Sequence, residues 1–153
     1  MSNLSKYITL QEAIQSNTAT VLQITNIPNA QQIENLKLVC TEVFDKVREH
    51  FGKPIGITSG FRSAELNKRI GGSKTSQHLE GKALDIDGDK LGGVSNKEIF
   101  DYIKNNCTFD QLIWEFGSEN NPDWVHVSYN KGVNRKQILR ATKSGGKTIY
   151  KPF

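Results

Sequence analysis

The stretch Ser76-Gln77-His78-Leu79-Glu80-Gly81-Lys82-Ala83-Leu84-Asp85 puts a histidine, a bend and the start of a strand within ten residues. Gly81 permits a tight turn between His78 and the residues that follow. From Ala83 to Asp87, aliphatic residues alternate with small or acidic ones, which is the period of a β-strand. Asp85 therefore lies on one face of this strand, and the turn can bring its carboxylate beside His78.

A second histidine lies in a similar alternating run, Asp123-Trp124-Val125-His126-Val127-Ser128. Two imidazoles and one carboxylate make a three-ligand set for catalytic zinc, with a fourth position left for water. Asp123 is the candidate to take a proton from that water, because the preceding Asn120-Asn121-Pro122 predicts a turn that would curl its side chain back. On spacing alone, polar residues that satisfy one another remain the alternative to a metal site.

Other titratable side chains compete with this set. His50 falls at the end of a predicted helix, where a cation suits the helix dipole. Asp87 shares the strand face of Asp85 and is a possible substitute ligand, and Glu80 is a further carboxylate nearby. Glu115, at the end of a predicted strand, could support a metal-bound histidine from outside the coordination sphere.

Capping boxes and apolar residues spaced three or four apart predict the helices, and alternation predicts the strands. Helices are expected to begin after Thr9, Asn29, Ser63 and Ser95, the second of them running to Phe51. Since the helices come first and the strands cluster late, we expect an α+β fold, a small antiparallel sheet with helices packed on one side. Strands are expected at 55–59, 83–87, 112–115, 124–129, 137–142 and 148–150.

The length of 153 residues predicts a single domain over 1–153. The net charge of +4 is unevenly distributed, because residues 131–153 hold seven basic residues and no acidic one. The first 130 residues therefore hold the other 13 basic residues and all 16 acidic ones, a balance of −3. We expect 131–153 to be a basic C-terminal end of the same domain, open to an anionic partner.

The start of the chain has no apolar segment typical of a signal peptide, and no apolar run approaches the ~20 residues that span a bilayer. We therefore expect a protein that is cytoplasmic at synthesis and does not insert into membranes. The basic end lacks the interleaved aromatic residues of a nucleic-acid-binding surface, so no nucleic-acid partner is expected.

Three motifs, in this order and spacing, resemble those of the zinc D-alanyl-D-alanine carboxypeptidases. Relatives of that family include vancomycin-resistance D,D-dipeptidases and phage L-alanyl-D-glutamate endolysins. The resemblance spans about Tyr7 to Tyr129. The residues that match are Ser59-Gly60-Phe61-Arg62-Ser63, then Ser76, His78, Gly81, Ala83 and Asp85, then Asp123, Trp124 and His126.

The resemblance implies a role for each matched polar residue. His78, Asp85 and His126 would hold one Zn²⁺, and Asp123 would be the general base, at a position where many relatives carry glutamate. Arg62 would bind a substrate carboxylate or steady the oxyanion. Ser76 and Trp124 would contact substrate, Ser76 also supporting the site by hydrogen bonding. The implied fold is the small α+β fold shared with the hedgehog signalling domain.

The implied activity is hydrolysis of peptidoglycan stem peptides by a zinc metallopeptidase. The bond could be D-Ala-D-Ala, cut by a carboxypeptidase, or L-Ala-D-Glu, cut by an endolysin-type endopeptidase in phage-driven cell wall degradation after release through a holin-type membrane hole. Anionic wall polymers are a further expected partner for the basic end, and a monomer is expected. The alternative is a non-catalytic zinc-containing module that binds the cell wall.

Overall fold

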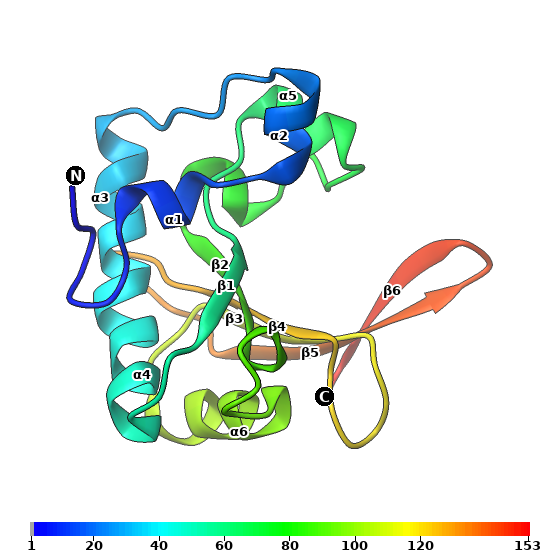
Figure 1. The fold of residues 1–153 in the computed structure, drawn as a ribbon. Helices are drawn as coiled ribbons and strands as arrows, with labels where there is room; N and C mark the ends of the chain where they lie inside the picture. The colour runs from blue at the N-terminus through cyan, green and yellow to red at the C-terminus, as the bar shows by residue number, and fades with distance from the viewer. Residues whose placement is uncertain (1) are drawn as a thin grey trace.

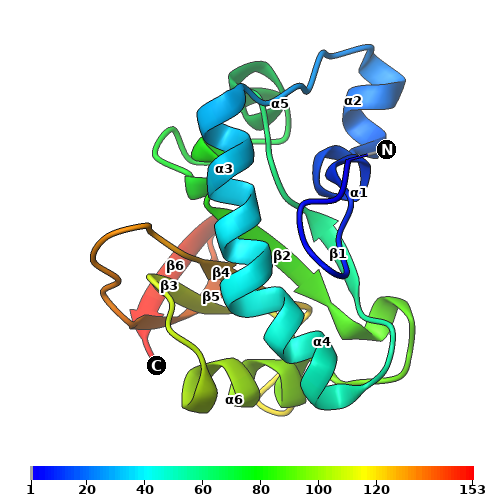
Figure 2. The ribbon, with the colours of Figure 1, turned by 90° about the vertical axis from the view of Figure 1, so that its left-hand side faces the viewer.

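The computed structural model describes residues 2–153 and has an α+β fold, as the sequence predicts. One mixed sheet runs through the centre, with a long helix on one side and a β-hairpin extending from its edge (Figure 1). In the view turned by 90°, the long helix crosses in front of the sheet (Figure 2).

Six strands make up the sheet in the order β1-β2-β4-β3-β5-β6. Four of the neighbouring pairs are antiparallel, and β3 with β5 is parallel, so the sheet is mainly but not wholly antiparallel. The parallel pair arises because the chain returns through β4 before entering β5 on the other side of β3. The strands are β1 (Gly56–Ser59), β2 (Ala83–Asp87), β3 (Gln111–Glu115), β4 (Trp124–Ser128), β5 (Gln137–Ser144) and β6 (Lys147–Pro152).

The predicted capping residues all begin helices. Thr9, Asn29 and Ser95 each form a complete capping box, and Ser63 accepts from the backbone N–H of Leu66. The α-helices are α1 (Leu10–Ile14), α2 (Asn17–Leu22), α3 (Ala30–Val39), α4 (Asp45–Phe51), α5 (Ala64–Arg69) and α6 (Asn96–Asn106). The shorter turns are η1 (Cys40–Phe44), η2 (Gln77–Glu80) and η3 (Gly88–Lys90).

Two features differ from the sequence expectation. The long helix runs from α3 to α4 through η1, a π-helical turn that the apolar spacing alone does not reveal. Ser16 caps α2, a short helix that the sequence pattern does not predict, by accepting from the N–H of Ala19. The short α2 has too few apolar residues to show a helical period.

The two faces of the sheet have different roles. Core-facing residues such as Leu84, Val125 and Val127 are fully buried in one cluster with the long helix and α6. The alternate residues of the same strands, including Asp85 and His126, lie on the opposite face. The hydrophobic core thus holds β2 and β4 rigidly from one side and leaves the other side for chemistry. None of the helices in the described part of the chain is long and apolar enough to cross a membrane.

Candidate metal centre

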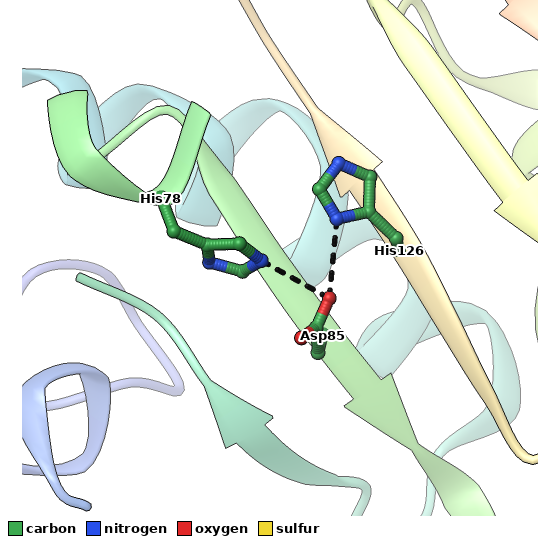
Figure 3. A group of neighbouring side chains, drawn as sticks. All are labelled: His78, Asp85 and His126. Carbon is green, nitrogen blue, oxygen red and sulfur yellow. Dashed lines mark hydrogen bonds and ion pairs between the residues drawn. The ribbon is translucent and has the colours of Figure 1, made fainter. Parts of the chain in front are cut away.

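Three buried polar side chains converge on the face of the sheet that is opposite the core. His78 comes from η2, Asp85 from β2 and His126 from β4, and Figure 3 shows the rings pointing at one carboxylate. Their exposed fractions are 2%, 6% and 8%. One ligand atom from each lies within 4.8 Å of the other two, and among the described residues this is the one such group found. The sequence-predicted ligand set is therefore assembled.

Local structure explains the convergence. Asp85 and His126 are direct partners in the antiparallel β2–β4 pair, so their side chains share a face at closest approach. Gly81 ends η2 in the left-handed conformation at φ +73°, and a Cβ there would lie 2.5 Å from the backbone oxygen of Gln32. The Ser76 hydroxyl accepts from the backbone N–H of His78 at 3.3 Å. The turn thus holds the first imidazole over the strand.

The distances suit a tetrahedral metal ion. Asp85 Oδ1 lies 3.2 Å from His78 Nε2 and 3.2 Å from His126 Nδ1. Zinc bonds of ~2.0–2.1 Å in a tetrahedron place neighbouring ligand atoms roughly 3.3 Å apart. His78 Nδ1 donates to the carbonyl oxygen of Gly60 at 2.6 Å, which fixes the ring with Nε2 facing the site. His126 Nδ1 is the ring nitrogen that faces Asp85, and Nε2, on the far side of the ring, is buried with no hydrogen-bond partner among the described residues.

The charge on Asp85 is strongly favoured. Burial acts to raise its pKa, but His78 and His126 outweigh that effect and hold the pKa well below its ordinary value. Arg62 Nη2 also contacts Asp85 Oδ2 at 3.2 Å. An ionised carboxylate flanked by two imidazoles is a donor set that suits a divalent cation such as zinc.

Arg62 is held in place by residues that the sequence interpretation missed. Its Nε donates to Ser59 Oγ at 3.0 Å and its Nη1 to Asn67 Oδ1 at 3.3 Å. Asn26 supports the same turn, since its amide donates to the Phe61 carbonyl and its Oδ1 accepts from the Ser63 N–H. The sequence carries no signal for this role, because the burial of Asn26, which obliges its amide to find partners, follows only from the fold.

A cleft of about 420 Å³ adjoins the metal centre. Arg62, Asp85 and Trp124 line it, so two of the predicted substrate-binding residues face this space. Three of the five N–H donors of Arg62 are used by the contacts described above, which leaves two for a ligand. Ser76 does not line the cleft, and its hydroxyl supports the η2 turn, so its contact with substrate remains a prediction.

Asp123, the predicted general base, is not a member of the converging group of three ligands. Its side chain is exposed, does not line the cleft and forms no hydrogen bond or ion pair to the ligands in the part of the chain that the structure describes. The Asn96 amide binds the Asp123 carbonyl at 2.9 Å, and the Asp123 N–H donates to the Glu115 carbonyl at 2.9 Å. These backbone contacts fix the turn that carries Asp123.

Glu115 is the carboxylate that the fold brings to the site. It pairs with Trp124, while Ile113, two residues earlier, pairs with His126, so Glu115 shares the ligand face one step along the strands. Its exposed fraction is 7%. The pKa of Glu115 is raised to about 7, and burial is the main cause. Asp85 adds to the rise, whereas His126 and Arg62 oppose it, so the charged residues of the site act directly on this carboxyl group.

The other competing carboxylates are engaged elsewhere. Asp87 lines the cleft on the face of Asp85, but its Oδ1 accepts from the Asn96 amide and the Asp89 N–H. Glu80 is exposed and lies 3.6 Å from the Lys82 ammonium. Neither belongs to the converging group.

Comparison with known families agrees with this geometry. The sequence profile of the peptidase M15 family matches residues 6–128, and that range contains all three ligands and Arg62. The match covers most of the 153 residues, and the chain belongs to the peptidase M15 family of zinc peptidases. No curated protein matches the chain.

Proposed function

We propose that this M15 peptidase hydrolyses peptidoglycan stem peptides. The observation that carries the proposal is the buried His78–Asp85–His126 group beside a cleft that also presents a guanidinium. Stem peptides offer the complementary groups, an amide to be cut and a nearby free carboxylate. A cleft of about 420 Å³ falls in the size range of sites that enclose small ligands or short peptide segments.

The three ligand side chains would hold one zinc ion, the metal on which this family depends. Zinc so placed lowers the pKa of a coordinated water to about 7 and polarises a carbonyl. Arg62 has two N–H donors left to bind the substrate carboxylate, and its contact with Asp85 Oδ2 fixes the orientation of that ligand. The guanidinium would thus bind the substrate and orient the metal ligand Asp85.

We propose Glu115 as the proton carrier of the reaction. Its buried carboxylate lies on the ligand face, where a carboxylate can accept a proton from the attacking water and pass it to the leaving amine. The pKa of about 7 applies to the metal-free site, where burial favours the neutral form of Glu115. The charge of a bound zinc ion would favour the carboxylate, which is the form that accepts the proton. Asp123 in this role stays a prediction of the sequence motif, and the two carboxylates can be tested against each other.

Digestion of purified muropeptides, followed by mass spectrometry, tests the activity and identifies the bond. Loss of one D-alanine indicates carboxypeptidase action, and release of L-alanine still attached to the glycan indicates cleavage before D-glutamate. Zinc analysis of the same sample should give one ion per chain, and His78→Ala should remove both zinc and turnover. Zinc bound without turnover of any muropeptide would instead support the non-catalytic wall-binding module.

We also propose that residues 131–153 attract anionic wall polymers. Two of their seven cations are paired with the body, Arg135 with Asp110 at 2.7 Å and Arg140 with Glu119 at 2.9 Å. The five lysines left are all exposed, and the hairpin that carries three of them extends from the body (Figure 1). The attraction is long-ranged and should therefore be sensitive to salt.

A further inference from the structure

The C-terminal hairpin places a tyrosine on the face of the sheet that carries the metal centre. Trp124, Glu115, Ala141 and Tyr150 are direct partners along one row across β4, β3, β5 and β6. Directly paired residues project to the same face of a sheet. Tyr150 therefore shares its face with Glu115, although it lies 22 residues beyond the end of the family match at 128.

Between Tyr150 and Glu115 the row holds one small residue, which its neighbours cover completely. Ala141 is the residue between them in the row, and its methyl group is the smallest side chain that a strand residue other than glycine can present. Two strand spacings of ~4.8 Å separate the backbones of Tyr150 and Glu115, which a phenol leaning over Ala141 largely spans. Tyr150 is 53% exposed, so its ring borders open space.

Charged residues of the metal centre and its cleft shift the pKa of the Tyr150 phenol. Burial raises its pKa, Glu115 and Asp85 raise it further, and Arg62 lowers it. All three of these residues belong to the metal centre or its cleft. The phenol therefore stays protonated in the working pH range and offers a neutral O–H donor to that space.

We propose that Tyr150 is a substrate-binding residue, whose hydroxyl donates a hydrogen bond to a backbone carbonyl oxygen of the peptide. The proposal rests on the peptidase function above and adds the hairpin as an extension of the substrate site beyond Glu115. Lys143 lies on the same face of the hairpin, with its ammonium 5.4 Å from the centre of the Phe116 ring, which itself packs on Trp124 at 5.4 Å. A continuous surface of side chains thus leads from the cleft to the hairpin.

The test uses Tyr150→Phe, which removes the hydroxyl alone, and Tyr7→Phe as a matched control. Tyr7 lies beneath the Arg48 guanidinium of α4, in the helical layer. With zinc-loaded protein, Tyr150→Phe should lower kcat/KM for a stem pentapeptide about tenfold at unchanged zinc content, the loss expected for one hydrogen bond of about 1.4 kcal/mol. A rise in KM indicates a contact outside the scissile bond, and a fall in kcat a contact with the scissile carbonyl.

A second readout does not depend on turnover. Titration of metal-free protein with the stem pentapeptide, followed by NMR, should show a dissociation constant about tenfold higher for Tyr150→Phe than for the parent and Tyr7→Phe. A parent that binds and cleaves the peptide, with Tyr150→Phe unchanged in both measurements, would overturn the role of Tyr150 alone. A parent that neither binds nor cleaves it would overturn the proposed substrate class, and this inference with it.

Discussion

Asp85 joins the metal centre to the substrate cleft through its two carboxylate oxygens. Oδ1 faces both imidazoles, and Oδ2 faces Arg62. Such outer contacts orient a ligand and commonly contribute 10- to 100-fold to metal affinity. Replacement of Arg62 should therefore weaken both zinc binding and substrate binding.

Arg62→Lys separates these two roles. A lysine keeps the charge but cannot reach Ser59, Asn67 and Asp85 at once, as the planar guanidinium does. We expect zinc affinity, measured by competition with a chelator, to fall about tenfold. Unchanged zinc affinity with reduced kcat/KM would show that Arg62 acts on substrate alone. Arg69→Lys, at the exposed end of α5, is the control.

The burial of Glu115 predicts a pH-dependent stability. Its pKa is about 7 in the folded chain and near 4.5 when exposed, so the folded state binds more protons between these values. Stability is therefore lost as pH rises through this window. In the metal-free protein, Glu115→Gln should be about 3 kcal/mol more stable than the parent at pH 8.

At pH 4 the difference between Glu115→Gln and the parent should nearly vanish, because both side chains are then neutral. Urea unfolding at the two pH values measures the change, and Glu65→Gln, at an exposed position, should show no such dependence. If the unfolding free energies of Glu115→Gln and the parent differed equally at pH 4 and pH 8, the Glu115 carboxylate would not be desolvated as the structure indicates.

The ligands could be predicted from the sequence, and Glu115 could be named as a carboxylate that supports them, but its place on the ligand face beside His126 could not. His78 and Asp85 belong to one short motif, and His126 to an alternating run whose face is clear from its neighbours. Glu115 reaches the site only through the register of β3 with β4, and no local pattern encodes that register. Asp123 had the motif spacing, and the contacts of Asn96 that fix its turn are likewise non-local.

At the scale of elements, the end of β1 must approach α1 closely. The Phe61 N–H donates to the Ala13 carbonyl at 2.8 Å, and a Cβ on Gly60 would lie 2.3 Å from that same oxygen. The carbonyl of Gly60 also holds the ring of His78. One small residue thus sets both the packing of α1 on β1 and the orientation of a metal ligand.

Gly60→Ala should therefore cost stability and zinc affinity together. The backbone contact cannot yield without moving α1 or β1, so we expect about 2–3 kcal/mol less unfolding free energy. Zinc binding should weaken as the Gly60 carbonyl moves. Gly132→Ala is the control, because a Cβ there meets nothing within 4 Å. Equal stability of the two variants in urea would contradict the close approach.

The capped helices and the alternating strands were predictable because their signals are local. The capping boxes at Thr9, Asn29 and Ser95 each confine both partners to four residues. The parallel pairing of β3 with β5 was not predictable, since alternation within a strand says nothing of the direction of its neighbour. The Asp110–Arg135 ion pair, which fastens the chain just before β5, joins residues 25 apart.

For the whole molecule, charge is divided between a slightly acidic body and a basic end. Replacing Lys131, Lys147 and Lys151 by glutamine should reduce retention on purified cell walls severalfold at low salt, and the difference should shrink above about 0.5 M salt. The same change of charge at Lys37, Lys46 and Lys97, on the helices, is the control. Retention that is unaffected by salt or by the first triple substitution would contradict electrostatic attraction by the basic end.

The proposed catalysis depends on Glu115, a carboxylate that the register of β3 with β4 brings to the metal centre. The most direct test compares the turnover of one muropeptide by Glu115→Gln and Asp123→Asn at equal zinc content. We predict that Glu115→Gln lowers kcat at least 100-fold, the smaller end of the range for general acid–base catalysis, while Asp123→Asn stays within about threefold of the parent. The reverse result, with Asp123→Asn inactive and Glu115→Gln active, would contradict the account.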